Sequence, residues 1–271
     1  MVSINTTASN SFVLSSLRQT NKDIATVQTR IGTGYKVSSA SDNSSVWATA
    51  QSIRADIKTQ ENSSSGISLA KAKADAGVAG LDKIADLLTK MQEVSDGLAT
   101  GASASEVTSA GNKIAAYQTQ ITAAINASGF QSSNFLKSTT AVSVKIGTDA
   151  AATLSLTPKD LTAETSVTAA VGALVASDAN VRAVSGLVTT ALATITGYQA
   201  TLSSFSAGLD SQLDFQKTLQ GIKETALSSL VDADMEQESA RLTSLQVKQQ
   251  LAYQALAITN SSSQNILALF R

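Results

Sequence analysis

Four carboxylates stand at every second position of one short stretch, and they are the residues of this chain best spaced to bind a cation. Grouped carboxylate oxygens are ligands that Ca²⁺ and Mg²⁺ prefer. The stretch lacks, however, the glycine and the terminal glutamate of an EF-hand loop. Acidic residues also stabilise the first turn of a helix through the helix dipole, and this accounts better for the pattern. We therefore expect a helix to begin here and no metal site. The four residues are Asp232, Asp234, Glu236 and Glu238.

Histidine and cysteine are both absent from the 271 residues. Their absence removes the commonest general base, the usual zinc ligand and every Ser-His-Asp or Cys-His scheme, and it excludes disulfides. The single tryptophan, Trp47, is interpreted as a packing or subunit-contact anchor. We therefore expect a protein that is not an enzyme, with no catalytic residue and no cofactor.

The composition favours long helices with small side chains. Aromatic residues make up 4% and charged residues 15% of the chain, and there is one proline. An average domain has about a quarter of its residues charged. The net charge is −1, and no basic patch is visible, which argues against a nucleic-acid partner. No apolar run is long enough to cross a membrane, so membrane insertion is not expected either.

The two ends of the chain carry the same helical pattern. Apolar and small polar residues alternate at spacings of three and four, which is typical of a coiled-coil seam. Gly32 and Gly34 end the first of these helices, and Asp42 or Asn43 suits the start of the next. The N-terminal seam holds Asn10, Val13, Leu17, Thr20, Ile24, Val27 and Ile31. The C-terminal seam holds Leu242, Leu245, Ala252, Leu256, Ser263, Ile266 and Phe270.

Between the two ends, the pattern predicts helices and one small sheet. Long helices are expected over residues 44–98, 105–128 and 179–230. Alternating Val and Leu residues on both sides of a Gly-Thr-Asp turn predict a β-hairpin over 142–156. The small, polar segment 159–178 suits a short surface insertion. The expected fold class is mainly α, with long coiled-coil helices from both termini and a small β-hairpin insertion.

Charge is scarce on both terminal helices. Residues 1–34 hold four charged side chains and residues 242–271 hold two. A lone helix in water usually shows a charged face. The scarcity of charge indicates that even the polar faces of these helices meet other protein, where an unpaired charge would be costly. A monomeric helical bundle is the plainer alternative. One chain cannot cover two such helices on every side, so we infer self-assembly.

Both ends resemble the terminal signatures of bacterial flagellin, the subunit of the flagellar filament. Residues 30–57 hold a Gly-containing turn and a Ser-Ala-x-Asp stretch that lead into a long helix. Residues 230–271 hold an acidic turn and an Asn-Ile-Leu-x-Leu-Phe-Arg ending. The hairpin also falls where flagellins place one. Only 159–178 remain for a variable outer region, which implies a short form without large outer domains.

The resemblance implies a division of labour along the chain. Residues 1–43 would form an inner-core helix and a linking turn, and 235–271 a second inner-core helix. Residues 44–140 and 179–234 would form an outer shell, with a hairpin and short insertion at 141–178. The expected linking turn includes Gly32, Gly34, Ser41 and Asp42. The expected polymerisation interface is Val13, Leu17, Ile24, Val27, Ile31, Leu242, Leu245, Leu251, Leu256, Ile266, Leu269 and Phe270.

The resemblance also implies function and partners. The chain would leave the cell without a cleavable signal peptide, since its first residues lack the features of one, and would polymerise into an extracellular flagellar filament for swimming. Its partners would be other flagellin subunits, the flagellar export apparatus, a flagellin chaperone, and the hook-associated junction and cap proteins. A hook–filament junction protein is the nearest alternative. A secreted adhesin or signalling ligand is a more distant one.

Overall fold

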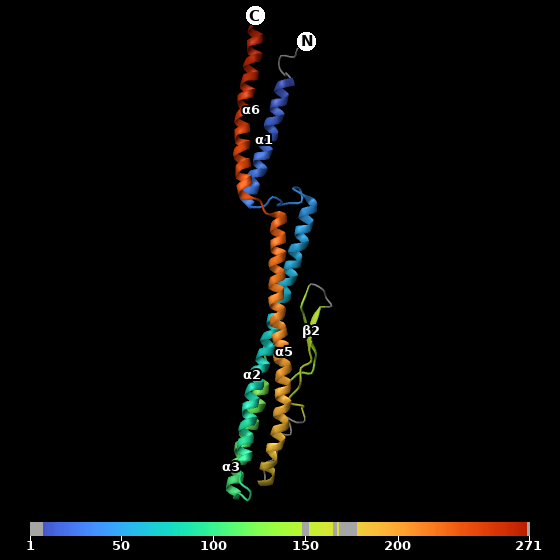
Figure 1. Cartoon of the computed structure of the whole chain (residues 1–271), viewed down its shortest axis with the longest axis vertical. Coiled ribbons are helices and arrows are strands. Elements are labelled where there is room, and N and C mark those ends of the chain that lie inside the picture. The colour runs from blue at the N-terminus through green and yellow to red at the C-terminus, as the bar shows by residue number, and fades with distance from the viewer. Residues whose placement is uncertain (1–7, 148–151, 165–166, 168–177, 270–271) are drawn as a thin grey trace. The chain divides into compact units, whose positions relative to one another are not determined.

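The chain is a succession of long helices with one hairpin (Figure 1). The computed structural model describes the backbone of residues 8–147, 152–164, 167 and 178–269. It describes the side chains of these residues except 8–10, 178–179, 259–260 and 262–269. The elements are α1 (Ala8–Thr33), α2 (Ser44–Asp96), α3 (Ala104–Ala127), β1 (Val142–Lys145), β2 (Thr153–Leu156), α5 (Asp178–Val231) and α6 (Met235–Leu269).

The fold class is the one that the sequence predicts, mainly α with one small hairpin. Asn43, one of the two residues expected to start α2, caps that helix, since its Oδ1 accepts a hydrogen bond from Val46 N (3.1 Å). α2 runs unbroken through its three glycines, 66, 77 and 80. No helix in the described part of the chain is long and apolar enough to cross a bilayer.

The chain divides into two compact units. We call Met1–Ile57 together with Gly221–Arg271 the terminal unit, and Lys58–Gln220 the central unit. The core of the central unit forms where α2, α3 and α5 present apolar residues at helical spacing. Its fully buried side chains include Ile67, Leu81, Ile84, Leu88 and Met91 of α2, Ile114 and Ile121 of α3, and Val184, Val188, Ile195, Leu202 and Leu209 of α5.

The hairpin packs onto this core through one face. β1 and β2 are antiparallel, with Val142 opposite Leu156 and Val144 opposite Leu154. Val144 and Leu156 are buried, whereas the alternate residues are exposed, as the period of two requires. Side chains of α5 fix the end of β1, since Gln212 and Gln216 both donate to the Ile146 carbonyl, the former at 2.7 Å.

The segment after the hairpin contributes to the core, although a surface insertion was expected over 159–178. Leu161 is fully buried, and its N–H donates to the Leu136 carbonyl (2.9 Å). Val167 is 1% exposed. A polar stretch with isolated apolar residues shows no period, and so its burial could not be read from the pattern. Most of the remainder, 165–166 and 168–177, lies outside the described residues.

In the terminal unit, α1 and α6 lie side by side and antiparallel (Figure 1). Two side-chain contacts fix their register. Arg30 of α1 meets Glu238 of α6 (Nη1 to Oε1, 3.0 Å), and Gln249 Nε2 of α6 donates to Asn21 Oδ1 of α1 (2.7 Å). Residues nearer the N-terminus of α1 therefore lie beside residues nearer the C-terminus of α6.

Candidate assembly interface

The two terminal seams bury against each other within one chain. Leu17, Val27 and Leu245 are 9%, 1% and 7% exposed, and the remaining seam residues of α1 and the neighbouring part of α6 are half-buried. Burial follows because both stripes repeat at three and four residues on adjacent helices. The half-buried set is Val13, Ile24, Ile31, Leu242 and Leu256. Ile266, Leu269 and Phe270 lie outside the residues whose side chains are described.

α6 carries a second apolar stripe that α1 does not cover. Val247, Leu251 and Ile258 are 50%, 57% and 69% exposed. At 3.6 residues per turn these positions share one face, roughly opposite the face of Leu245 and Leu256. We call these three residues the outward stripe. A helix that is apolar on two opposite faces needs a partner on each, and the described chain supplies only one.

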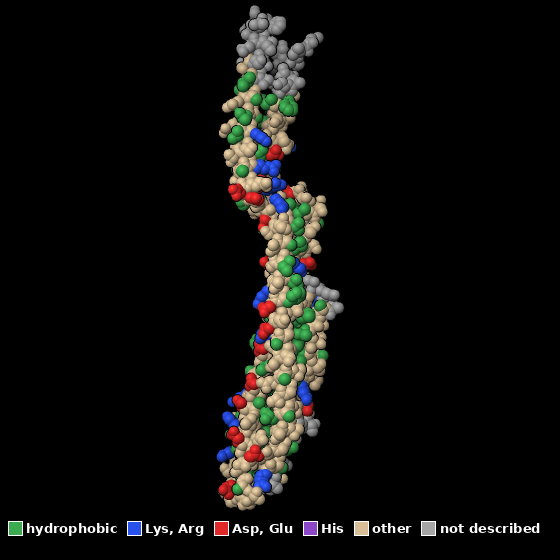
Figure 2. Space-filling view, in the orientation of Figure 1, with side chains coloured by type: hydrophobic (Ala, Val, Ile, Leu, Met, Phe, Trp, Pro, Cys, Tyr) green, Lys and Arg blue, Asp and Glu red, His purple; other side chains and the backbone are tan. Residues whose placement is uncertain are grey.

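Charged side chains on the α1–α6 pair are gathered toward one end. They belong to residues 18–30 of α1 and 236–248 of α6, whereas residues 8–17 and 249–269 contain none. In Figure 2 the blue and red side chains lie near the start of α6, and green and tan surface follows beyond them. A surface with little charge loses little solvation when it is buried, so this end of the pair suits contact with further protein.

The expected linking turn is part of a small bonded structure, the elbow, made of residues 34–43 and 232–234. Gly34 ends α1 with φ +76°, and its N–H donates to the Arg30 carbonyl (2.8 Å). This left-handed backbone favours glycine. Tyr35 and Asp232 then form an antiparallel β-bridge, and Ala233 N donates to the Gly34 carbonyl (2.8 Å). Gly32 lies inside α1, in its last turn.

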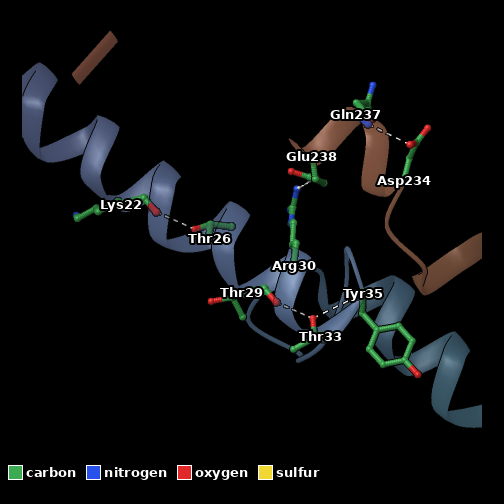
Figure 3. Close-up of polar contacts among 9 residues, drawn as sticks. All are labelled: Lys22, Thr26, Thr29, Arg30, Thr33, Tyr35, Asp234, Gln237 and Glu238. Atoms are coloured by element: carbon green, nitrogen blue, oxygen red, sulfur yellow. Dashed lines mark hydrogen bonds and ion pairs between the residues drawn. The ribbon is translucent and has the colours of Figure 1, made fainter. Parts of the chain in front are cut away.

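The acidic run serves the elbow as a helix start, as predicted (Figure 3). Asp234 Oδ1 accepts hydrogen bonds from Glu236 N and Gln237 N, both at 3.0 Å, and so caps α6. Glu238 is turned toward Arg30, with side-chain exposures of 8% and 28%. Among the described residues, no cluster of His, Cys, Asp or Glu could hold a metal ion.

Asp42 and Ser41 belong to the other arm of the elbow. Ser41 Oγ lies 2.9 Å from Ser39 Oγ. Asp42 Oδ2 accepts from the backbone N–H groups of Ser38 and Ser39 (3.0 and 2.9 Å) and from both of their hydroxyls. These bonds favour the charged carboxylate, and the Ser38 N–H, followed by the Ser38 hydroxyl and the Ser39 groups, lowers the pKa of Asp42.

The Asp42 turn should therefore weaken in acid. Because the folded pKa is lowered, its stabilising contribution is present above the ordinary aspartate value of 3.8 and is lost as pH falls through the folded pKa. We expect the stability difference between the wild-type chain and Asp42→Asn to be constant near neutral pH and to shrink below pH 3.8. Denaturant unfolding at a series of pH values measures it. A difference that does not change with pH would contradict the assignment.

Comparison with known proteins places these features in a family. The chain matches the family model described as the bacterial flagellin N-terminal helical region over residues 4–141, and the one described as the C-terminal helical region over 185–270. Flagellin FljM of Caulobacter vibrioides is 37% identical over 280 residues, covering 99% of this chain and 98% of the relative.

Further matches are of the same kind. A flagellin of Brucella melitensis biotype 1 is 36% identical over 286 residues, covering the whole of both chains. Among solved structures, Bacillus cereus flagellin aligns with a TM-score of 0.49 and 21% identity, over 57% of this chain and 88% of that one. With both terminal family regions matched in order, and relatives that align over nearly all of both chains, the chain belongs to the bacterial flagellin family.

Proposed function

We propose that this chain is exported and polymerises as the structural subunit of a bacterial flagellar filament. Membership of the flagellin family supports a filament subunit. The observation that carries the residue-level proposal is the outward stripe of α6, which stays exposed after α1 has covered the opposite face. In the filament, α1 and α6 of neighbouring copies would cover the outward stripes.

Assembly is driven by burial that one copy cannot complete. The polymerisation interface combines the seam residues, which are buried or half-buried within the chain, with side chains such as Leu251 and Ile258 that are exposed. Burial of apolar surface contributes about 25 cal/mol per Å². That gain must offset the entropy lost when a free chain is fixed in place, so growth on an existing end that offers several neighbours is favoured over pairing of two free chains.

The chain would pass through the flagellar export apparatus, with a flagellin chaperone before export, and reach an extracellular filament. It would meet the hook-associated junction and cap proteins at the two filament ends. The role is structural, and the family is a family of structural proteins.

Seeded growth tests the proposal. Sheared wild-type filaments are mixed with full-length chain or with chain lacking the last eight residues, and elongation is followed by electron microscopy. We expect the full chain to elongate and the truncated one to fail. A chain of full length with Ser at positions 266, 267, 269 and 270 separates loss of apolar surface from loss of length, and should also fail. Equal growth of all three would refute the mechanism.

A further inference from the structure

The central unit has a groove between α2 and β1 with a volume of about 430 Å³. One wall is α2 and the other is β1, and β2 contributes none of the lining residues. Leu69, which is 37% exposed, stands in the groove without a cover. The apolar part of the lining consists of Gly66, Leu69, Ala70, Val142 and Val144.

Gly66 keeps the groove open, and nothing within the central unit requires it. A Cβ atom built on Gly66 meets no atom within 4 Å. By contrast, a Cβ on Gly77 would lie 2.7 Å from a methyl group of Leu202, and one on Gly80 would overlap Ser128. A glycine inside a helix weakens it relative to alanine. The chain itself therefore leaves room for a side chain at Gly66, and its absence leaves the groove free for an occupant from outside the chain.

The charges of the groove indicate the chemistry of its occupant. Lys73 and Lys145 line it, and within the described part of the chain neither has an ion-pair partner. An occupant that combines an apolar side chain with a carboxylate would satisfy both the apolar lining and the lysines.

The same chain displays such a combination on α5. Phe215 is 54% exposed, and the adjacent Asp214 side chain is 79% exposed. Asp214 meets Lys217 at 3.3 Å, an exposed pair that is easily exchanged for another. Phe215 is not one of the groove's lining residues, so it remains free to enter the groove of a second copy.

We propose that the groove between α2 and β1 receives Phe215 of a second copy of this chain, with Asp214 of that copy against Lys73 and Lys145. The groove and the Phe215 side chain are different surfaces of the chain, so the contact is head-to-tail. Such a contact leaves a free groove at one end and a free Phe215 at the other, and repetition builds an open polymer. The inference rests on the proposed filament function and adds to it a contact made outside the terminal helices.

A charge exchange tests the pairing directly in seeded growth. Lys145→Glu and Asp214→Lys should each slow elongation and raise the critical concentration. The double variant restores an opposite-charge pair between positions 145 and 214 and should recover part of the lost growth, although Lys73 then faces a like charge. Phe215→Ala should raise the critical concentration about tenfold, as expected for a buried aromatic anchor. Single variants that grow like the wild type would overturn the proposal, as would a double variant that grows no better than either single one.

Filling the groove is the second test. Gly66→Leu adds a side chain where there is open space, so it should leave thermal unfolding of the monomer unchanged or raise its midpoint while it blocks growth. Gly197→Leu is the matched control, an exposed helical glycine of α5 whose Cβ also meets nothing within 4 Å. If the wild type elongates and Gly66→Leu elongates equally well, the groove contact is refuted and the filament function is not. A wild-type chain that never elongates would instead refute the filament function.

Discussion

Leu251→Asp should abolish filament growth and leave the free chain folded. Leu251 is 57% exposed in the free chain, so a carboxylate there remains in water, and surface changes of this kind shift stability by about 0.5 kcal/mol or less. In the filament the same carboxylate would be buried without a partner. Such a burial costs about 3 kcal/mol or more, which corresponds to a rise of about 100-fold or more in the critical concentration.

Two control variants separate the burial of a charge in the outward stripe from other effects of substitution on α6. Leu251→Met keeps the volume and the apolar character, and should elongate like the wild type. Gln246→Asp adds the same charge to an exposed position of α6 outside the outward stripe, and should cost much less. Elongation from wild-type seeds and circular dichroism of the free chain are the two measurements. A Leu251→Asp chain that elongates normally would show that the outward stripe is not buried in the filament.

The terminal helices were predictable because their signals are local. A seam repeats every three or four residues, and a glycine with a left-handed backbone ends α1 at a position marked in the sequence. The acidic run likewise marks the start of α6, because a helix dipole attracts carboxylates over a single turn. Each of these inferences needs only residues within about one or two turns of one another.

The contacts that bring distant segments together were not predictable in the same way. Arg30 and Glu238 are 208 positions apart, and neither residue differs in kind from the other charges near it. The sequence grouped Leu251 with the seam residues of α6 as one interface. The structure shows that they occupy two faces, since only the antiparallel neighbour α1 determines which face is covered.

The glycines of α2 show most clearly what the sequence alone cannot predict. A glycine inside a predicted helix argues against its continuity, and the sequence alone does not distinguish Gly66, Gly77 and Gly80 from one another. In the structure, Gly66 faces open space, whereas Gly77 and Gly80 face the packed interior beside Leu202 and Ser128. The same residue type thus permits close packing at two positions and leaves a groove open at the third.

Gly80→Ala should accordingly destabilise the central unit, although alanine favours helix more than glycine does. The added methyl group would overlap Ser128 Oγ, lie 2.6 Å from Ser128 Cβ and 3.0 Å from Leu136 Cδ1. Ser128 cannot easily withdraw, because its hydroxyl donates to the Ala124 carbonyl at the end of α3 and Leu136 is fully buried. Overpacking of this kind costs about 1–3 kcal/mol, more than the gain of about 0.5–1 kcal/mol in helix propensity.

A second substitution tests whether the cause is the contact with Ser128. Ser128→Gly removes both atoms nearest to the new methyl group, so Gly80→Ala with Ser128→Gly should be more stable than the sum of the two single effects predicts. Gly197→Ala, whose Cβ meets nothing within 4 Å, should raise stability by about 0.5–1 kcal/mol. Denaturant unfolding of the four variants and of the wild type measures these differences. Packing determines the sign of the stability change at Gly80, and helix propensity determines it at Gly197. The two alanine substitutions should therefore shift the free energy of unfolding in opposite directions. Shifts in the same direction would contradict this packing of Gly80 against Ser128.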